Sequence, residues 1–446
     1  FDGVPVKITA IANPGYTFQA WDPNATIPAG ALTQASVNYN ISTNDLFRAV
    51  FTGSAQPQTV TISEINYNPD PSVDGGNWIE LHNFGNAAID LTAWHIKTKN
   101  HWDKFTFEDG TILNPGAFLV VCEDTNLFYL TYPQVSNVVG GSGFDWSNKW
   151  DSVRVYNPID NLVLTARYSD ELPFPKCADG WGRTLENNNL SQLPLDATNW
   201  FCGCIGGSPG EAYSLCEEPI IISEFNYNNS NPAVDAGDWV ELHNNTLATI
   251  NLASYVFKDS ENENSYTFPS LSIAPDSFIV ISNNLSLFSQ RHPLVANVFG
   301  EFNFGMATND GIRIYDNTGT IINSFVYDTI APWSAMPSVF DLTNEYDFYN
   351  GYLDQNNGVS WFVGCPGGSP GTQFIPCITS TDPTFEPNAE IFVSLYPNPA
   401  NTSITLSIEN SLLTNESTEL IIHTVHGSII EKRSIKNHSG NLMNIE

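Results

Sequence analysis

Residues 61–83 read TISEINYNPDPSVDGGNWIELHN, and a closely similar string, IISEFNYNNSNPAVDAGDWVELHN, follows at residues 221–244. Trp78 maps on Trp239, a shift of 161 positions (239 − 78). The same shift relates WFCGCIGGSPGEAYSLC, starting at Trp200, to WFVGCPGGSPGTQFIPC, starting at Trp361. A period this long predicts tandem domains rather than a solenoid of short repeats.

Each copy consists of short apolar segments separated by Gly, Pro, Asn and Asp turns. No stretch shows a sustained apolar period of about 3.6 residues, so long amphipathic helices are not expected. Short strands of this number and spacing predict an all-β chain of tandem immunoglobulin-like β-sandwiches with long loops. In the first copy the expected strands include 62–67, 78–81, 118–121 and 153–156.

The segments on either side of the duplication have their own patterns. Apolar alternation at the start, followed by the turn dipeptide Pro14-Gly15, predicts a small β module and a chain that begins inside a folded region. Alternation at Ile404, Leu406 and Ile408 predicts a partial C-terminal β-sandwich. The expected order is the module at 1–55, copies at 59–217 and 218–378, a linker at 379–390 and a C-terminal domain at 391–446.

Composition excludes several classes of function. Hydrophobic residues make up 41% of the 446, enough for packed cores, while 48 acidic against 16 basic residues give a net charge of −32. Such a chain repels phosphate backbones, so no nucleic-acid partner is expected. No run approaches the roughly 18 apolar residues of a membrane span. Nucleophile elbows, phosphate-binding loops and paired-His helices are missing from the sequence, which predicts that the chain is not an enzyme.

The repeated strings carry a resemblance to a known family. The Ile62-Ser63-Glu64-Ile65 string, followed about 15 residues later by the string that starts at Trp78, resembles the lamin-tail domain of bacterial exported proteins. The second copy repeats the resemblance. Such domains accompany surface nucleases, phosphatases and CotH-like proteins, so the resemblance implies attachment or spacing rather than a reaction.

The C-terminal string VSLYPNPANTSITLSIEN, starting at Val393, resembles the type A C-terminal domain of type IX secretion cargo in Bacteroidetes. The motif residues are Tyr396, Pro397, Asn398 and Pro399. The resemblance implies export through the periplasm to the cell surface or the medium. Its implied partners are the type IX translocon and the outer-membrane barrel that receives such domains. The family's last two strands would follow Glu446, so we expect a truncated domain.

The N-terminal string VKITAIANPGYTFQAW at residues 6–21 resembles bacterial repeat modules and the segment that closes CotH-like proteins. Two readings of function follow. The first is a non-catalytic adhesion, spacer or interaction region of a type IX cargo protein. The alternative is the accessory tail of a secreted enzyme, such as a CotH-like kinase, whose catalytic domain lies upstream of residue 1.

The seven cysteines follow the duplication in part. Two of them recur in both copies, which predicts the same short disulfide twice, and two more occur only in the first copy, which predicts a third bridge. The alternative is a zinc site made by the four cysteines of the first copy, of which the second copy keeps two. The expected pattern is Cys177–Cys202, Cys204–Cys216, Cys365–Cys377 and a buried free Cys122.

Two further sets of loop residues are candidates for ligand binding. The first set consists of carboxylates in oxygen-rich loops that could hold calcium, although their spacing matches no EF-hand: Asp70, Asp74, Asp235 and Asp238. No other cofactor is expected. The second set consists of loop tryptophans that could stack on a surface glycan: Trp102, Trp146 and Trp150. A carbohydrate-binding module is therefore a further alternative for the function. Packing of these rings at the edge of the core is the favoured interpretation.

Repeated polar residues also lie inside the expected strands. We interpret them as a structural charge network in which each Arg pairs with one or both Glu of its copy: Glu64, Glu80 and Arg154, then Glu224, Glu241 and Arg313. A glycosidase-like acid–base pair is the functional alternative. The favoured role of the repeated His82 and His243 is structural, and the repeated GGSPG string is expected to form a tight turn inside a disulfide loop.

Overall fold

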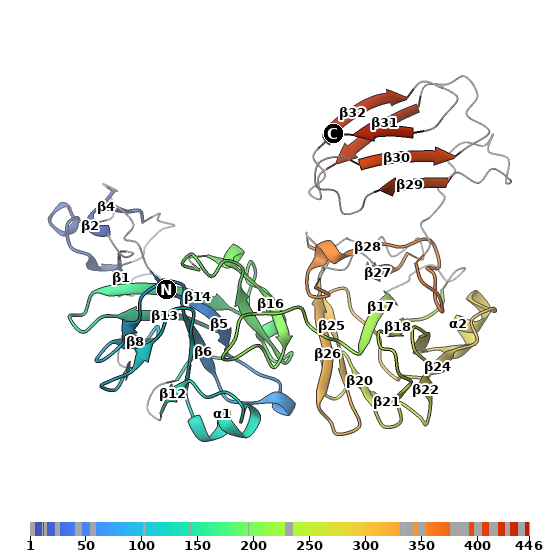
Figure 1. Cartoon of the computed structure of the whole chain (residues 1–446), viewed down its shortest axis with the longest axis horizontal. Helices are drawn as coiled ribbons and strands as arrows, with labels where there is room; N and C mark the ends of the chain where they lie inside the picture. Colours follow the sequence, from blue (N-terminus) through green and yellow to red (C-terminus); the bar gives the residue numbers. More distant parts are fainter. Residues whose placement is uncertain are drawn as a thin grey trace. The chain divides into compact units, whose positions relative to one another are not determined.

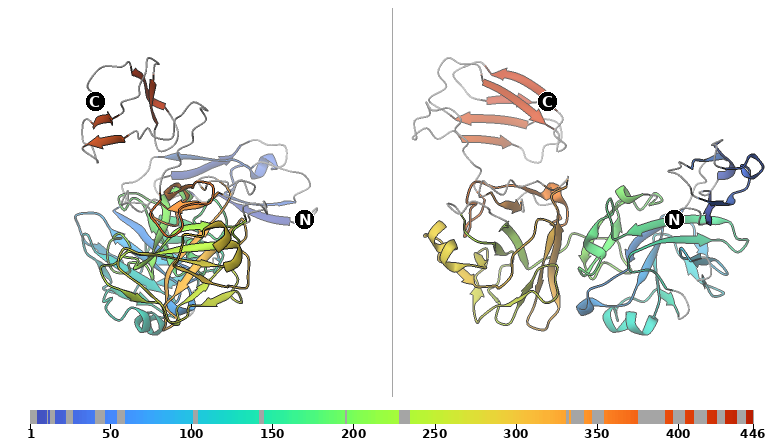
Figure 2. Two further views of the ribbon diagram at one scale, coloured as in Figure 1. Left: turned by 90° about the vertical axis from the view of Figure 1, so that its right-hand side faces the viewer. Right: turned by 180° about the vertical axis from the view of Figure 1, so that it is seen from behind.

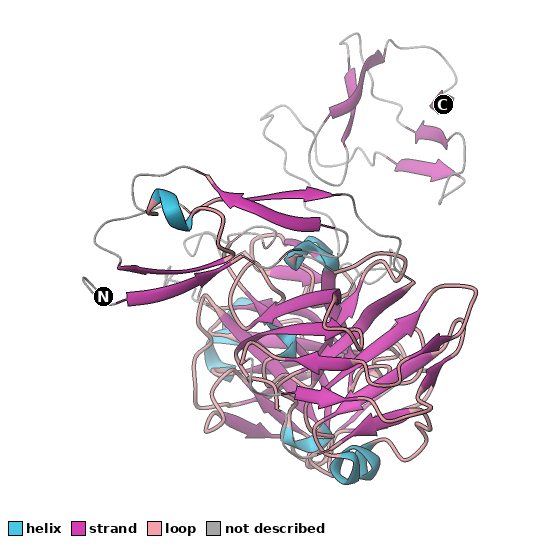
Figure 3. Cartoon of the chain, turned by 90° about the vertical axis from the view of Figure 1, so that its left-hand side faces the viewer, coloured by secondary structure: helices cyan, strands magenta, loops and turns pink. Residues whose placement is uncertain are grey.

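The computed structural model is almost entirely β-structure (Figure 3). It describes residues 5–10, 12, 16–22, 27–40, 47–53, 59–100, 104–141, 145–194, 196–227, 235–330, 333, 342–346 and 354–374, and the backbone of five strands between 392 and 445. The chain divides into two compact units, Phe1–Pro376 and Cys377–Glu446. Within the described residues no helix is long and apolar enough to cross a bilayer.

The N-terminal module consists of two antiparallel strand pairs around a small core. Strand β1 (Pro5–Thr9) pairs with β3 (Ser36–Asn40), and β2 (Tyr16–Trp21) pairs with β4 (Ala49–Gly53). The buried side chains of this core are Trp21, Ile27 and Val37.

The first copy is a sandwich of a six-stranded and a four-stranded sheet (Figure 1). The larger sheet has the order β12-β11-β6-β5-β15-β16, and the smaller one has the order β14-β13-β8-β9. The strands of the larger sheet are β5 (Val60–Asn66), β6 (Trp78–Asn83), β11 (Phe118–Cys122), β12 (Val138–Gly140), β15 (Arg183–Asn187) and β16 (Trp200–Ile205). The other strands are β7 (Ile89–Asp90), β8 (His95–Lys97), β9 (Lys104–Thr106), β10 (Ile112–Leu113), β13 (Trp150–Tyr156) and β14 (Leu162–Ser169), with β7 pairing with β10.

The second copy repeats this topology strand for strand. Its larger sheet has the order β24-β23-β18-β17-β27-β28, and its smaller sheet has the order β21-β20-β25-β26. The strands of the larger sheet are β17 (Ile220–Asn226), β18 (Trp239–Asn244), β23 (Phe278–Ser282), β24 (Val298–Gly300), β27 (Asn344–Tyr346) and β28 (Trp361–Val363). The other strands are β19 (Ile250–Asn251), β20 (Val256–Lys258), β21 (Ser265–Thr267), β22 (Ser272–Ile273), β25 (Asp310–Tyr315) and β26 (Ile321–Tyr327). The expectation of an all-β chain with tandem immunoglobulin-like sandwiches is confirmed.

Strand alternation decides what each face of the larger sheet contacts. Ile79 and Leu81 point into the main core between the two sheets, so Glu80 points to the opposite face. Part of that face is covered by the helix α1 (Thr125–Thr131), whose Phe128 packs edge-on against Trp78. In the second copy α2 (Leu285–Arg291) places Phe288 against Trp239 in the same way. Both faces of the sheet are therefore buried.

The C-terminal unit contains two small antiparallel sheets (Figure 2). The first has the order β29-β30-β33, and the second is the pair β31-β32. The bounds are β29 (Phe392–Tyr396), β30 (Ile404–Glu409), β31 (Thr418–His423), β32 (Ile429–Ile435) and β33 (Leu442–Ile445). Tyr396 of the sequence motif ends β29, while Pro397, Asn398 and Pro399 lie outside the described residues.

Candidate functional site

Three buried glutamates lie side by side on neighbouring strands of the first copy. Glu80 of β6 faces Glu64 of β5, and Glu64 faces Glu186 of β15. Their exposed fractions are 1%, 0% and 3%. A β-bulge between Ile62 and Glu64 shifts the register by one residue and so brings Glu64 opposite Glu80. We call Glu80, Glu64 and Glu186 the first glutamate row.

The GGSPG loop, residues 206–210, covers this row. The Ser208 amide donates to Glu64 Oε1 at 3.0 Å, and the Ser208 hydroxyl donates to Glu186 Oε1 at 2.9 Å. The Gly210 amide donates to Glu80 Oε2. Gly207 has a φ of 74°, and a Cβ at this position would lie 2.1 Å from Glu64 Oε1. The loop therefore requires glycine both for its backbone conformation and for its close approach to the carboxyl group.

Hydroxyl groups of neighbouring side chains also donate hydrogen bonds to the row. The Ser63 hydroxyl donates to Glu80 Oε1 at 2.7 Å, and the Thr184 hydroxyl donates to Glu64 Oε1 at 2.6 Å. Burial raises the pKa of Glu64 to about 7, although these hydrogen bonds lower it in part. The pKa values of Glu80 and Glu186 are raised well above their ordinary value, first by burial and then by the charge of Glu64. The row is thus a set of carboxyl groups that hold protons near neutral pH.

The second copy has the same arrangement. Glu241 of β18, Glu224 of β17 and Glu345 of β27 form the second glutamate row. The second GGSPG loop, residues 367–371, covers it: the Ser369 amide donates to Glu224 Oε1 at 3.1 Å, and the Gly371 amide donates to Glu241 Oε2. Burial raises the pKa of Glu241 to about 8. Two copies built alike support a structural role for the rows.

The predicted pairing of glutamates with arginines is wrong. Arg313 donates to the Asp259 carbonyl oxygen at 2.6 and 3.0 Å and to Asn262 Oδ1 at 2.9 Å. Arg154 donates to the carbonyl oxygen of Thr98. Both arginines belong to the four-stranded sheets, whereas the paired glutamates belong to the six-stranded sheets and point away from the shared core. The row and the arginine are therefore on different layers of the sandwich.

The loop carboxylates proposed for calcium make other contacts. Asp70 Oδ1 accepts a hydrogen bond from the Ser72 amide at 2.8 Å, and its Oδ2 accepts one from the Tyr315 hydroxyl at 2.7 Å. Backbone amides of loop residues donate to the remaining three: Asp74 accepts from Gly76, Asp235 from Gly237, and Asp238 from Met306. The described residues contain no group of three or more His, Cys, Asp or Glu side chains placed to hold a metal ion. Within that part of the chain, the carboxylates shape loops.

The tryptophans proposed for glycan stacking do not form one platform. Trp146 is 3% exposed and belongs to the core, which agrees with the favoured prediction of packing and leaves the ring no face for a glycan. Trp150 is 50% exposed, but the Lys99 ammonium lies 4.2 Å from its ring centroid. Trp102 lies outside the described residues. The His82 and His243 rings pack on Phe118 and Phe278, as a structural role requires.

The predicted disulfides are present wherever both cysteines are described. Cys177 bonds to Cys202, and Cys204 bonds to Cys216, which excludes the zinc alternative because these four sulfurs are used. Cys122 is free and buried. Cys365 is disulfide-bonded, and its predicted partner Cys377 lies outside the described residues.

A contact between the two copies was not predicted from the sequence. The Arg183 side chain is 1% exposed and donates from Nε to the Ser324 carbonyl oxygen of the second copy at 2.8 Å. It also donates to the Gly203 carbonyl oxygen and pairs with Glu218. The Ser324 hydroxyl returns a hydrogen bond to the Trp181 carbonyl oxygen at 2.6 Å.

The duplication contains a signal for this contact. Glu186 and Glu345 hold equivalent places in the two rows. Counting back three positions from each leads to Arg183 in the first copy and Leu342 in the second. A buried arginine that only one copy has marks a contact that only this copy makes.

Comparison with known families agrees with this architecture. A family model described as Lamin Tail Domain matches residues 53–170 and 217–329. A second model, described as Secretion system C-terminal sorting domain, matches residues 394–446. No protein with a curated description matches the chain. Among solved structures the chain is similar to a DUF4876 family protein from Bacteroides thetaiotaomicron, with 10% identity, 67% of this chain and 95% of that chain covered, and a TM-score of 0.26.

The two matches to the first family model together cover more than half of the chain. The sorting domain indicates export by the type IX secretion machinery to the cell surface or the medium. The chain belongs to the lamin tail domain family, with two copies of that domain followed by a type IX sorting domain.

Proposed function

We propose that this chain is the non-catalytic spacer and interaction region of a type IX cargo protein that is displayed outside the cell. The observation that carries the proposal is the contact between the two lamin-tail copies. A spacer must resist bending, and a joint with buried, hydrogen-bonded partners resists bending better than a flexible linker does.

The joint has polar contacts at several places along its length. Besides the bonds of Arg183, the Tyr315 hydroxyl donates to Asp70, and the Ile321 amide donates to the Ser72 hydroxyl at 2.9 Å. Lys176 pairs with Asp328 at 3.3 Å. Contacts this widely spread support a tandem that behaves as one rigid body.

The buried state of the glutamate rows supports a non-catalytic role. A glycosidase-like pair needs a cleft where substrate reaches both carboxyl groups. Glu64 and Glu224 have exposed fractions of 0%, and the GGSPG loops cover them. The carboxyl groups that looked most like an acid–base pair are thus used to hold a loop.

The test measures how far the chain extends from the cell. In a type IX-competent host, the chain with an N-terminal epitope tag is compared with a variant that lacks residues 59–374 and keeps the sorting domain. Both are expected outside the cell, because the sorting domain is retained. Antibody-coated beads should bind intact cells that carry the longer chain and bind the shorter one much less.

A variant lacking only residues 218–374 should give intermediate bead binding. Equal bead binding by all three would contradict the spacer role. Recovery of all the tagged protein from the medium would contradict display.

A further inference from the structure

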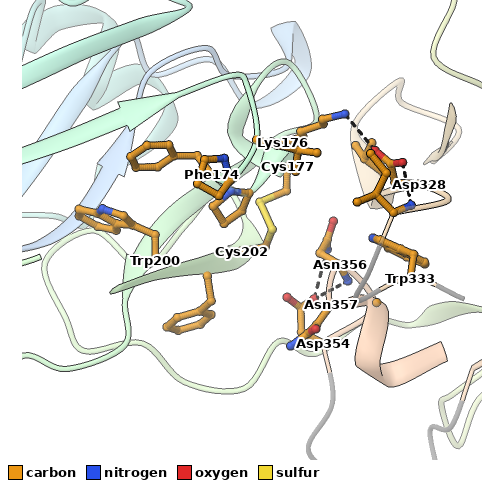
Figure 4. Close-up of a pocket in the computed structure, with 17 residues that line it drawn as sticks. Phe174, Lys176, Cys177, Trp200, Cys202, Asp328, Trp333, Asp354, Asn356 and Asn357 are labelled. Carbon is orange, nitrogen blue, oxygen red and sulfur yellow. Dashed lines mark hydrogen bonds and ion pairs between the residues drawn. A yellow bond between two sulfur atoms is a disulfide. The ribbon is translucent and has the colours of Figure 1, made fainter. Parts of the chain in front are cut away.

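A cavity of about 230 Å³ lies where the two lamin-tail copies meet. Figure 4 shows Phe174, Trp200 and the Cys177–Cys202 disulfide of the first copy on one side. Trp333, Asp328 and Asp354 of the second copy lie on the other side. Neither copy alone encloses this space, so the cavity is a product of the tandem.

The apolar walls of the cavity are aromatic and fixed in place. Trp333 packs on the second core, with its ring nearly parallel to Phe325 at 6.1 Å. Trp200 belongs to the first core, and Phe174 packs against that core. Rigid rings of this kind offer flat apolar faces on which the CH groups of a sugar ring can stack.

The two cations nearest the cavity are already paired within the protein. Asp328 pairs with Lys176 at 3.3 Å and also accepts hydrogen bonds from two backbone amides. Burial raises the pKa of Asp354 and the charge of Arg183 lowers it in part, while Arg183 itself pairs with Glu218. An anionic ligand would have to disrupt these pairs, and a cationic one would lose its hydration beside the aromatic walls, so the cavity favours a neutral one.

Polar groups remain for such a ligand. Asp354 accepts hydrogen bonds from the Asn356 amide at 2.9 Å and side chain at 3.2 Å, and both go to Oδ1. Asn357 uses Oδ1 to accept from the Val359 amide at 3.2 Å. Among the hydrogen bonds between described residues, none uses Asp354 Oδ2 or Asn357 Nδ2. These atoms are an acceptor and a donor, which suits hydroxyl groups because a hydroxyl both donates and accepts.

The size and mouth of the cavity limit the ligand further. A volume of about 230 Å³ is smaller than the roughly 300–1,000 Å³ of pockets for drug-sized ligands. Ile330 and Asn357 line the cavity and are solvent-exposed, so the cavity is open there. One ring fits inside while the rest of a longer molecule extends outward.

We propose that this cavity binds one neutral sugar ring of a glycan, stacked between Trp333 and the aromatic wall of the first copy and hydrogen-bonded by Asp354 and Asn357. The site differs from the tryptophans that the sequence suggested for glycan stacking, because neither Trp146 nor Trp150, the two that the structure describes, lines this cavity. The inference goes beyond the spacer role, which would stand if the cavity bound nothing.

The test uses the full chain on an array of neutral and charged glycans, followed by calorimetric titration with the best binder. The expected result is binding of neutral glycans with a dissociation constant that is measurable in the millimolar range or below. Asn357→Ala should weaken it about tenfold, as the loss of one hydrogen bond to the ligand would. Ile330→Arg should block the mouth and abolish binding, and because Ile330 is exposed, the melting temperature of this variant should not change.

Trp150→Ala is the matched control, since it removes an exposed tryptophan of β13 that does not line the cavity. Binding should be unchanged in that variant. No binding to any neutral glycan, binding to uronic acids or amino sugars alone, or loss of binding in Trp150→Ala but not in Asn357→Ala would each overturn the proposal. The bead assay of the spacer role does not depend on these outcomes.

Discussion

At the scale of single residues, the glutamate rows are places where carboxyl groups are removed from water. Every hydrogen bond that the described residues give to Glu64 comes from a hydroxyl, a carboxyl or a backbone amide. Ionising such a carboxyl group costs free energy that no cation compensates, so the neutral form is favoured in the folded state.

Stability should therefore fall as the pH rises. The pKa of Glu64 is about 7 and that of Glu241 about 8 in the folded state, above the value of 4.5 for an unperturbed glutamate. The stabilisation that the protonated glutamates give the folded state is fully present below about pH 4.5. It is lost as the pH rises through 7 and 8, because the unfolded chain releases these protons more readily. The melting temperature, followed by circular dichroism at fixed salt, should be higher at pH 5 than at pH 8.5.

Two variants separate this effect from the general repulsion of a chain with a net charge of −32. Glu64→Gln removes one titrating group and should reduce the fall in melting temperature. Glu108→Gln removes an exposed carboxylate and should leave the fall unchanged. A melting temperature that rises from pH 5 to pH 8.5 in the parent would rule out the proposed protonation.

Gly207→Ala should destabilise the protein more than an ordinary glycine substitution. Alanine at a left-handed φ costs about 1–3 kcal/mol, and here the added Cβ would also displace the Glu64 carboxyl group. Gly110→Ala is the matched control, because Gly110 has a φ of 84° and no atom lies within 4 Å of the position that a Cβ would take there. Urea unfolding should give a larger loss for Gly207→Ala, and equal losses would mean that the loop can move away.

At the scale of elements, the strands were largely predictable and their pairing was not. The expected strands at 62–67, 78–81, 118–121 and 153–156 correspond to β5, β6, β11 and β13. Apolar alternation shows which residues are buried, but it does not show which sheet a strand joins. The pattern therefore pairs the arginine strands with the wrong neighbours. It does not point to Glu186, because β15 pairs with β5 across more than 100 residues of sequence.

The disulfide Cys204–Cys216 fastens the segment that carries the first GGSPG loop. It closes a span of 12 residues, for which the loop-entropy model gives about 3 kcal/mol of stabilisation. The double variant Cys204→Ser/Cys216→Ser should lose about this much in urea unfolding. Non-reducing peptide mapping of the parent should recover Cys122 as a free thiol, and a bridged Cys122 would contradict the pattern.

At the scale of the whole molecule, the joint between the two copies depends on a few side chains that break the duplication. A sequence comparison between the two copies identifies the residues that they share, which are those of the glutamate rows and of the sandwich cores. The joint needs residues that differ, such as Arg183 against Leu342, and the cavity beside it is lined by residues from both copies. Neither could be recognised from the repeated strings.

Arg183→Met should weaken the joint. Removing the guanidinium leaves Glu218 buried without its cation, and losing one partner of a buried pair costs about 3–5 kcal/mol. Small-angle X-ray scattering should show a larger radius of gyration in the variant if the copies separate. Arg167→Met, at an exposed position of the first copy, should change neither quantity. An unchanged scattering profile in Arg183→Met would mean that the other contacts suffice.

The GGSPG loops also affect the order in which the chain can assemble. Each loop follows all the described strands of its copy in the sequence. The loop that covers a glutamate row is therefore synthesised after the row itself. Until residue 210 or residue 371 has emerged, three carboxyl groups face water and ionise at neutral pH, and their mutual repulsion opposes closure of the sheet. A lamin-tail copy that is cut short before its loop is thus expected to be held open by its own charge.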